Sequence, residues 1–134
     1  MSAPDEFLDT NVLIYAFTTD PRAVTAEKLL AKGCVISVQC LNEFANVARR
    51  KLGMSWEETH DALGAIRSLA KTILPVDLDT HSRALRLAER YALSFFDALM
   101  LAAALQGGCA TFWSEDMQHG TAIEERLRIV NPFA

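Results

Sequence analysis

The sequence predicts an α/β fold in which a mostly parallel central sheet lies between two layers of helices. Two observations lead to this prediction. Short apolar and β-branched segments alternate along the chain with longer segments of helical periodicity, and strands joined through helices pair in parallel by right-handed crossovers. The chain also has 134 residues, 51% of them hydrophobic, which suits one compact core, so we expect a single domain over residues 1–134.

Strands and helices are expected in alternation from the N-terminus onward. The expected strands are residues 6–9, 34–37, 72–76, 109–113 and 127–130. The expected helices are residues 10–17, 22–32, 38–51, 56–71, 80–92 and 97–106. The last of these helices is apolar on all sides, so we expect it to be buried in the core.

Capping residues and glycines mark where several helices begin and end. Ser55 precedes a glutamate by three residues, the spacing of a capping box. Asp79 or Thr80 is expected to cap the helix that continues to about residue 92. Gly33 ends the second helix, and Gly107–Gly108 end the last one.

Composition excludes several classes of protein. The longest apolar stretch has eight residues, far fewer than the roughly 20 that span a bilayer, and the N-terminus lacks the basic region of an export signal, so we expect a cytoplasmic protein. The cysteines are odd in number and form no C-x-x-C pair, which favours buried, reduced thiols over disulfides or a zinc site. They are Cys34, Cys40 and Cys109.

Carboxylates must therefore carry any chemistry, because the three histidines lie far apart and form no H-x-x-x-H pair. The 17 acids and 13 bases give a net charge of −4, which at first counts against a polyanionic partner such as nucleic acid. That objection weakens if several of the acids bind a metal ion.

Four acidic residues are predicted to gather at one edge of the sheet, outside the carboxyl ends of the strands, where ligands bind in α/β folds. Asp9 ends the first strand, and Glu43 lies in the opening turns of the helix after the second strand. Asp116 follows the strand at 109–113. Asp97 begins the helix before that strand, and since helix and strand run antiparallel, it belongs to the same edge.

Taken singly, most of these acids have a purely structural explanation. Asp9 and Asp97 can cap helices, and Asp116 can occupy a turn. Glu43 borders an apolar helix face, where an acid without a partner is costly. Four clustered carboxylates would repel one another unless a cation neutralised them, and ligand sets made only of oxygen suit Mg²⁺ or Mn²⁺. The convergence therefore predicts a divalent metal site.

The segments around these acids carry a family resemblance. They are Phe7-Leu8-Asp9-Thr10-Asn11, Asn42-Glu43, Phe96-Asp97-Ala98-Leu99, residues 114–120 (Ser-Glu-Asp-Met-Gln-His-Gly) and the terminal Val130-Asn131-Pro132-Phe133. In order and spacing these motifs resemble those of PIN-domain ribonucleases, and most closely the VapC toxins of bacterial toxin–antitoxin pairs. The resemblance spans nearly the whole chain and implies a three-layer PIN-like fold.

The resemblance implies a metal-dependent endoribonuclease whose catalytic and metal-binding acids are Asp9, Glu43, Asp97 and Asp116. Three aspartates would hold one Mg²⁺ or Mn²⁺, directly or through water, while Glu43 binds a second ion or orients the attacking water. In this mechanism the metal activates water to hydrolyse the RNA phosphodiester bond, and no protein nucleophile is needed.

Three neighbouring residues bear on how these acids are held. Asn11 and Ser114 are candidates for orienting the carboxylates by hydrogen bonds, although a helix-capping role explains Asn11 equally well. Ser114 stands where threonine is common in the family and keeps the hydroxyl group. Glu115 is a second acid next to Asp116, and motif position favours Asp116 as the ligand.

The resemblance also implies an RNA substrate, a homodimer and a cognate VapB-like antitoxin that covers the site. Tyr15, Phe17 and Trp56, if exposed, suit a protein interface, and core packing is the alternative. Two other functions stay open: a metal-dependent phosphatase or phosphotransfer domain, and a catalytically silent PIN-type interaction module. The first usually needs a D-x-D motif or a pivotal lysine, which Asp9-Thr10-Asn11 does not supply, and the presence of all four acids disfavours the second.

Overall fold

A computed structural model describes residues 4–134 and contains one six-stranded sheet in the order β3-β2-β1-β4-β6-β5. The strands are β1 (Glu6–Leu8), β2 (Val35–Ser37), β3 (Thr72–Leu74), β4 (Thr111–Trp113), β5 (Ala122–Ile123) and β6 (Leu127–Val130). The helices are α1 (Thr10–Tyr15), α2 (Ala23–Ala31), α3 (Val38–Arg50), α4 (Trp56–Leu69), α5 (Leu78–Tyr91) and α6 (Phe95–Gln106).

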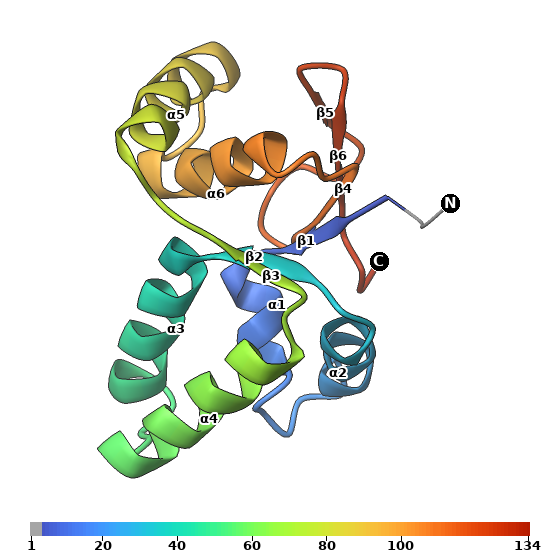
Figure 1. The fold of residues 1–134 in the computed structure, drawn as a ribbon. Coiled ribbons are helices and arrows are strands. Elements are labelled where there is room, and N and C mark those ends of the chain that lie inside the picture. Colours follow the sequence, from blue (N-terminus) through green and yellow to red (C-terminus); the bar gives the residue numbers. More distant parts are fainter. Residues whose placement is uncertain (1–3) are drawn as a thin grey trace.

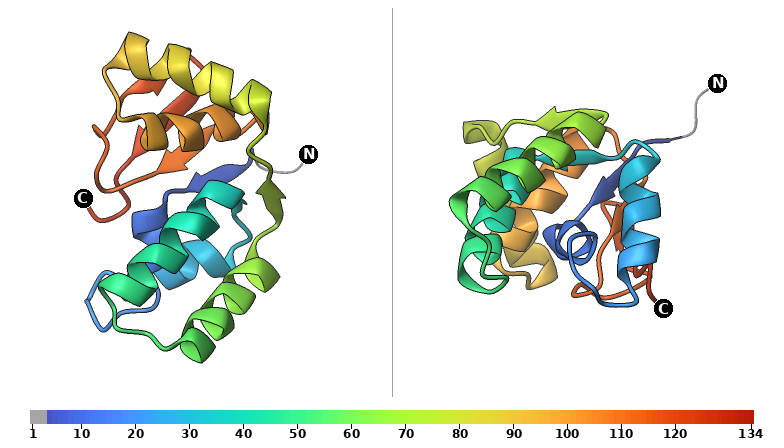
Figure 2. Two further views of the ribbon diagram at one scale, coloured as in Figure 1. Left: turned by 90° about the vertical axis from the view of Figure 1, so that its left-hand side faces the viewer. Right: turned by 90° about the horizontal axis from the view of Figure 1, so that it is seen from below.

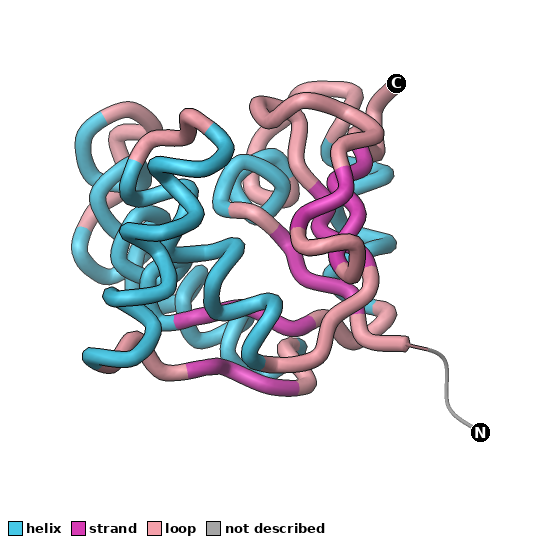
Figure 3. Tube along the Cα trace, turned by 90° about the horizontal axis from the view of Figure 1, so that it is seen from above, coloured by secondary structure: helices cyan, strands magenta, loops and turns pink. Residues whose placement is uncertain are grey.

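Helices cover the sheet from two sides. Helices α5 and α6 pack against each other on one side, and α1 to α4 form a group on the other (Figure 1). The left panel of Figure 2 shows the same separation from a second direction. Figure 3 shows that the strands are short segments in a chain made mostly of helix and loop. The predicted α/β class with three layers is confirmed.

The sheet is parallel except at one edge. Strand β1 pairs in parallel with β2 and β4, β2 pairs in parallel with β3, and β4 does so with β6. Strand β5 pairs antiparallel with β6 and was not predicted, since two residues carry no periodicity. Because β1 and β4 run in register, their carboxyl ends meet, and the Asp9 amide donates to the Trp113 carbonyl at 3.0 Å just beyond them.

The core is built around α6 and the central strands. All residues of α6 from 98 to 105 are buried, as its apolar sequence predicts. Phe7 of β1 stacks on Phe112 of β4 with ring centroids 5.1 Å apart. The three cysteines are buried and free, which confirms the prediction from their number, and burial raises the pKa of the Cys40 thiol to about 12.

Helix α5 begins two residues earlier than the capping prediction. Asp77, rather than Asp79 or Thr80, is the capping residue, and its carboxylate accepts a hydrogen bond from the Thr80 amide at 2.9 Å. Thr80 completes the capping box from inside the helix. Several residues able to cap follow one another here, and Asp77 is the one whose backbone is extended.

Helix α6 also begins earlier than predicted, at Phe95, with Ser94 as its capping residue. The Ser94 hydroxyl accepts from the Asp97 amide at 3.2 Å, so Asp97 lies inside the first turn. The capping box at Ser55 is as predicted. Within residues 4–134, no helix has both the length and the apolar character to cross a membrane. Residues 1–3, part of the segment in which no export signal is expected, lie outside the described residues.

Candidate active site

A cleft of about 460 Å³ opens at the carboxyl edge of the sheet, between α1, α3, the first turn of α6 and the loop after β4. All four predicted acids line it. We call it the acid cleft, and the charged residues that line it are Asp9, Glu43, Lys51, Asp97, Glu115 and Asp116. Residues more than 100 positions apart thus meet because β1 and β4 are neighbours in the sheet.

A second hollow of about 490 Å³ shows by contrast what is unusual about the acid cleft. It contains two acids and two lysines in two ion pairs, Lys32 with Glu6 at 3.0 Å and Lys71 with Asp5 at 2.6 Å. Its charges are therefore balanced by the protein itself. The acid cleft has five carboxylates and a single lysine among the residues that line it, so its negative charge is in excess.

Asp9 is the most enclosed of the four acids, with 4% of its surface exposed. One carboxylate oxygen, Oδ1, caps α1 by accepting from the Thr10 amide at 2.6 Å. The other, Oδ2, accepts from the Ser114 hydroxyl at 2.7 Å and from Asn11 Nδ2 at 3.1 Å. Asp9 is therefore a helix cap and a cleft residue at the same time, since its two oxygens serve different partners.

Burial and, to a smaller extent, the charges of Asp97 and Glu43 raise the pKa of Asp9 to about 7, against the lowering effect of the hydrogen bonds from Ser114 and Thr10. Burial likewise raises the pKa of Asp97, assisted by the charge of Asp116 and opposed by the hydrogen bond with Ser94. Both pKa values are thus raised first by burial, and the negative charge of neighbouring acids adds to the shift.

Asn11 and Ser114 both donate to the same carboxylate oxygen of Asp9, Oδ2. Asn11 Nδ2 donates to Asp9 and also to Asp116 Oδ2 at 3.0 Å, while its Oδ1 accepts from the Glu115 amide at 3.3 Å. The capping alternative for Asn11 is wrong, because Asp9 is the cap of α1. Ser114 is fully buried and accepts from the Met117 amide at 3.3 Å, which orients its hydroxyl toward Asp9.

Glu43 faces the cleft from α3 and is partly buried. Gln39, one turn earlier, donates from Nε2 to Glu43 Oε2 at 3.1 Å. One carboxylate oxygen of Glu43 is thereby held in place by an uncharged donor. Gln39 does not neutralise the negative charge of Glu43.

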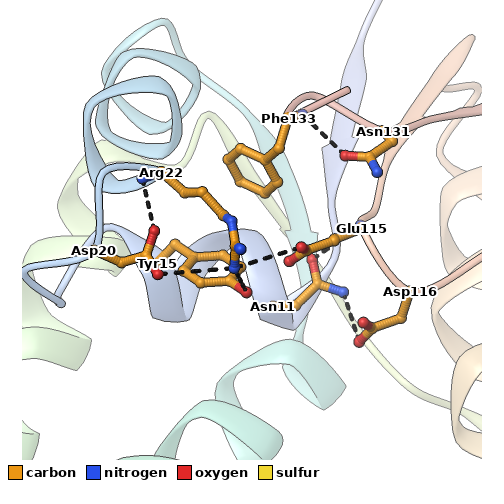
Figure 4. A network of polar contacts seen from close by, with 8 residues as sticks. All are labelled: Asn11, Tyr15, Asp20, Arg22, Glu115, Asp116, Asn131 and Phe133. Carbon is orange, nitrogen blue, oxygen red and sulfur yellow. Dashed lines mark hydrogen bonds and ion pairs between the residues drawn. The ribbon is translucent and has the colours of Figure 1, made fainter.

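Glu115 and Asp116 are adjacent in sequence but turn to different partners (Figure 4). Glu115 extends toward Arg22, with Oε1 3.5 Å from Arg22 Nη1, whereas Asp116 extends toward Asn11. The Asp116 side chain is therefore linked to the buried Asp9 through Asn11, whereas the Glu115 side chain contacts Arg22.

Sequence reasoning missed Arg22, since an exposed arginine before a helix has no special pattern. The Arg22 guanidinium donates to the Tyr15 hydroxyl and lies over the Tyr15 ring, 4.9 Å from its centroid.

The donor set fits a hard divalent cation, although the described residues are not arranged as a finished site. Within residues 4–134, no three His, Cys, Asp or Glu side chains lie close enough to hold one ion as they stand. The amide hydrogens of Asn11 lie between Asp9 and Asp116 and partly offset their charge. Carboxylate oxygens with an uncompensated buried charge are the ligands that Mg²⁺ and Mn²⁺ prefer.

Solved structures share this fold. A toxin–antitoxin complex from Klebsiella pneumoniae matches with a TM-score of 0.73 and 21% identity, over 96% of this chain and 98% of that one. FitAcB from Neisseria gonorrhoeae matches with a TM-score of 0.70 and 20% identity, over 96% and 98%. VapC20 from Mycobacterium tuberculosis, a toxin that cleaves the sarcin–ricin loop, matches with a TM-score of 0.68 and 24% identity, over 84% and 92%.

Sequence comparison identifies the family directly. No curated protein matches the chain in sequence. The model of the PIN domain matches residues 7–122, which includes most of β1, all six helices and the four predicted acids. Since this match covers most of the chain and the fold agrees with it, the protein belongs to the PIN-domain family.

Proposed function

We propose that this protein is a metal-dependent endoribonuclease and the toxin of a toxin–antitoxin pair. The observation that carries the proposal is the meeting of Asp9, Glu43, Asp97 and Asp116 in one cleft, where Asp9 is buried and its pKa is raised to about 7. A cleft with this excess of carboxylate charge suits a cation and a phosphate that the cation attracts. The similarity to VapC20, a toxin that cleaves the sarcin–ricin loop, supports RNA as the substrate.

Asp9, Asp97 and Asp116 would hold Mg²⁺ or Mn²⁺ in this cleft. When bound, the cation would neutralise the carboxylates and lower the pKa of a coordinated water so that it can attack phosphorus. Ser114 and Asn11 keep the Asp9 carboxylate in one orientation. Glu43, held through one oxygen by Gln39, keeps the other oxygen for the attacking water or for a second ion.

The expected products follow from the residues of the cleft. None of the three histidines lines it, so no side chain of the kind that usually activates the 2′-hydroxyl of RNA is at hand. We therefore expect water, rather than the 2′-hydroxyl, to attack phosphorus, which leaves a 5′-phosphate and a 3′-hydroxyl. A 2′,3′-cyclic phosphate at the cleaved end would contradict this mechanism.

Cleavage of a labelled RNA with Mg²⁺, with Mn²⁺ and with excess EDTA tests the function. We expect cleavage with either ion, none in EDTA, and none by the Asp97→Asn variant. Asp61→Asn is the matched control, because Asp61 is exposed on α4, outside the cleft. Undiminished cleavage in EDTA, or by Asp97→Asn, would refute the assignment.

We also propose that the protein binds an antitoxin and forms a homodimer. Structures of toxin–antitoxin complexes are similar in fold over nearly the whole chain, which supports an antitoxin partner. Of the three aromatic residues considered for an interface, Tyr15 and Phe17 pack edge-on against Phe133 and Phe44, whereas Trp56 is 64% exposed. Light scattering that shows a strict monomer at high concentration would remove the dimer.

A further inference from the structure

The charges that line the acid cleft do not by themselves explain how it would attract an RNA backbone, which is also negative. Five carboxylates and one lysine line it, so phosphates are repelled unless bound metal and nearby bases outweigh the acids. Lys51 lies at the end of α3. Arg22 is a further base beside the cleft, next to two of its lining residues, Tyr15 and Glu115.

Arg22 is held in place by protein contacts that leave much of its head group free. All of its side-chain hydrogen bonds and ion pairs involve one nitrogen, Nη1, which donates to the Tyr15 hydroxyl and lies 3.7 Å from Asp20 and 3.5 Å from Glu115 (Figure 4). Nε and Nη2 donate no hydrogen bond to any residue in the described part of the chain, 4–134. The side chain is 43% exposed, so these donors can reach a ligand in solvent.

The support beneath Arg22 is itself fixed. The guanidinium lies over the Tyr15 ring, which also packs edge-on against Phe133 with 5.2 Å between ring centroids. The Phe133 amide donates to the Asn131 side chain at 2.9 Å, which orders the turn that carries Phe133 (Figure 4). The Asn131 amide in turn donates to His119 Nδ1 at 2.9 Å and ties this segment to the loop after β4. A planar arginine held on an aromatic ring loses little conformational freedom when it binds a phosphate.

The carboxylates near Arg22 are weak competitors for it. The distances of 3.5 Å to Glu115 and 3.7 Å to Asp20 exceed the 2.7–2.9 Å that is typical of charge-assisted hydrogen bonds, and all three side chains are partly exposed. A phosphate oxygen can therefore replace Glu115 as the partner of Arg22 at little cost. Glu115 directly precedes Asp116, so this position borders the acids.

We infer that Arg22 binds a phosphate of single-stranded RNA next to the bond that is cleaved, and that Glu115 is its partner only while RNA is absent. This inference rests on the proposed function. The Arg22 guanidinium would then contact the RNA backbone and no base, so the contribution of Arg22 to binding does not depend on the base sequence.

The test is RNA binding by Arg22→Gln in an Asp97→Asn background, which prevents cleavage. Fluorescence anisotropy with a labelled single-stranded RNA is measured in Mg²⁺ at several salt concentrations. We expect about tenfold weaker binding and a salt slope smaller by about 0.7, the loss of one contact to single-stranded phosphate. Arg67→Gln is the control, since Arg67 is exposed on α4 outside the acid cleft, and it should change neither quantity.

A second measurement separates phosphate binding from a merely structural role. Arg22→Gln with Asp97 intact should bind Mn²⁺, followed by electron paramagnetic resonance without RNA, as tightly as the unmodified protein. Equal RNA affinity and salt slope for Arg22→Gln and Arg67→Gln would overturn the inference. Weaker Mn²⁺ binding with unchanged RNA affinity would also overturn it, since Arg22 would then position Asp116 through Glu115.

The inference and the proposed function fail in different ways. If the unmodified protein cleaves RNA and Arg22→Gln cleaves it with an unchanged KM, only the role of Arg22 is wrong. If the unmodified protein neither cleaves RNA in Mg²⁺ or Mn²⁺ nor binds it, the proposed function is wrong, and the role of Arg22 falls with it.

Discussion

Replacing Asp9 by asparagine should stabilise the metal-free protein, and the gain should grow as the pH rises. Asp9 is 4% exposed, and burial together with the charges of Asp97 and Glu43 raises its pKa from 3.8 to about 7. Between these two values the folded protein keeps a proton on Asp9 that the unfolded chain has released. Raising the pH through this window therefore favours the unfolded chain, and the penalty is complete above pH 7.

The magnitude follows from the difference of about 3 pKa units, which corresponds to roughly 4 kcal/mol above pH 7 and roughly 2 kcal/mol at pH 5. An asparagine avoids this penalty and keeps an oxygen for the Thr10 amide. Its NH₂ group would face Asn11 Nδ2, which now donates to Asp9, and losing that bond costs about 1–2 kcal/mol. We expect a net gain of roughly 2–3 kcal/mol at pH 8 and almost none at pH 5.

Urea denaturation in EDTA at pH 5, 6, 7 and 8, followed by circular dichroism, measures this difference in the free energy of unfolding. Asp61→Asn is the control, because the Asp61 side chain is exposed and makes no hydrogen bond or ion pair with residues 4–134, so its effect should stay within about 0.5 kcal/mol at every pH. A loss of stability in Asp9→Asn at pH 8, or a gain that does not change with pH, would refute the reasoning.

Three further predictions concern the metal, the Ser114 hydroxyl and one backbone position. Mg²⁺ or Mn²⁺ at about 100 times its Kd should raise the free energy of unfolding by about 2.7 kcal/mol, and a melting temperature that ignores both ions would contradict a metal site. Ser114→Ala removes the 2.7 Å hydrogen bond to Asp9 and should weaken metal binding about 10- to 100-fold by calorimetry, whereas equal affinity would show that the bond is dispensable. Ala92→Gly should stabilise the protein by up to about 1 kcal/mol in urea, because Ala92 has φ 54° in a left-handed cap that glycine adopts without strain, and a loss of stability would contradict this.

The order of strands and helices could be predicted because it is encoded locally. The apolar stretch from Ala98 to Leu105 determines that α6 is buried, and the spacing of Ser55 and Glu58 determines where α4 begins. Parallel strands joined through helices bring Asp9 and Asp116 to one edge, so the sequence was sufficient to predict that these acids meet.

Local patterns were insufficient where several choices had similar free energies. Asp77, Asp79 and Thr80 are all able to cap α5, and the one with an extended backbone is the cap. Strand β5 has two residues and forms only because β6 offers an open edge for antiparallel pairing. Such elements depend on what lies beside them in space, which no single segment records.

For the candidate site too, the sequence determined one part and the tertiary structure another. The sequence by itself determined which acids lie at the carboxyl edge, because strand ends and helix starts fix their backbone positions. Only the tertiary structure decided their partners, since Asn11 reaches Asp116 from 105 positions away and Glu115, after β4, meets Arg22 at the start of α2. A hydrogen bond depends on distances within a few tenths of an ångström, and only the packing of the completed sheet and helices sets those distances.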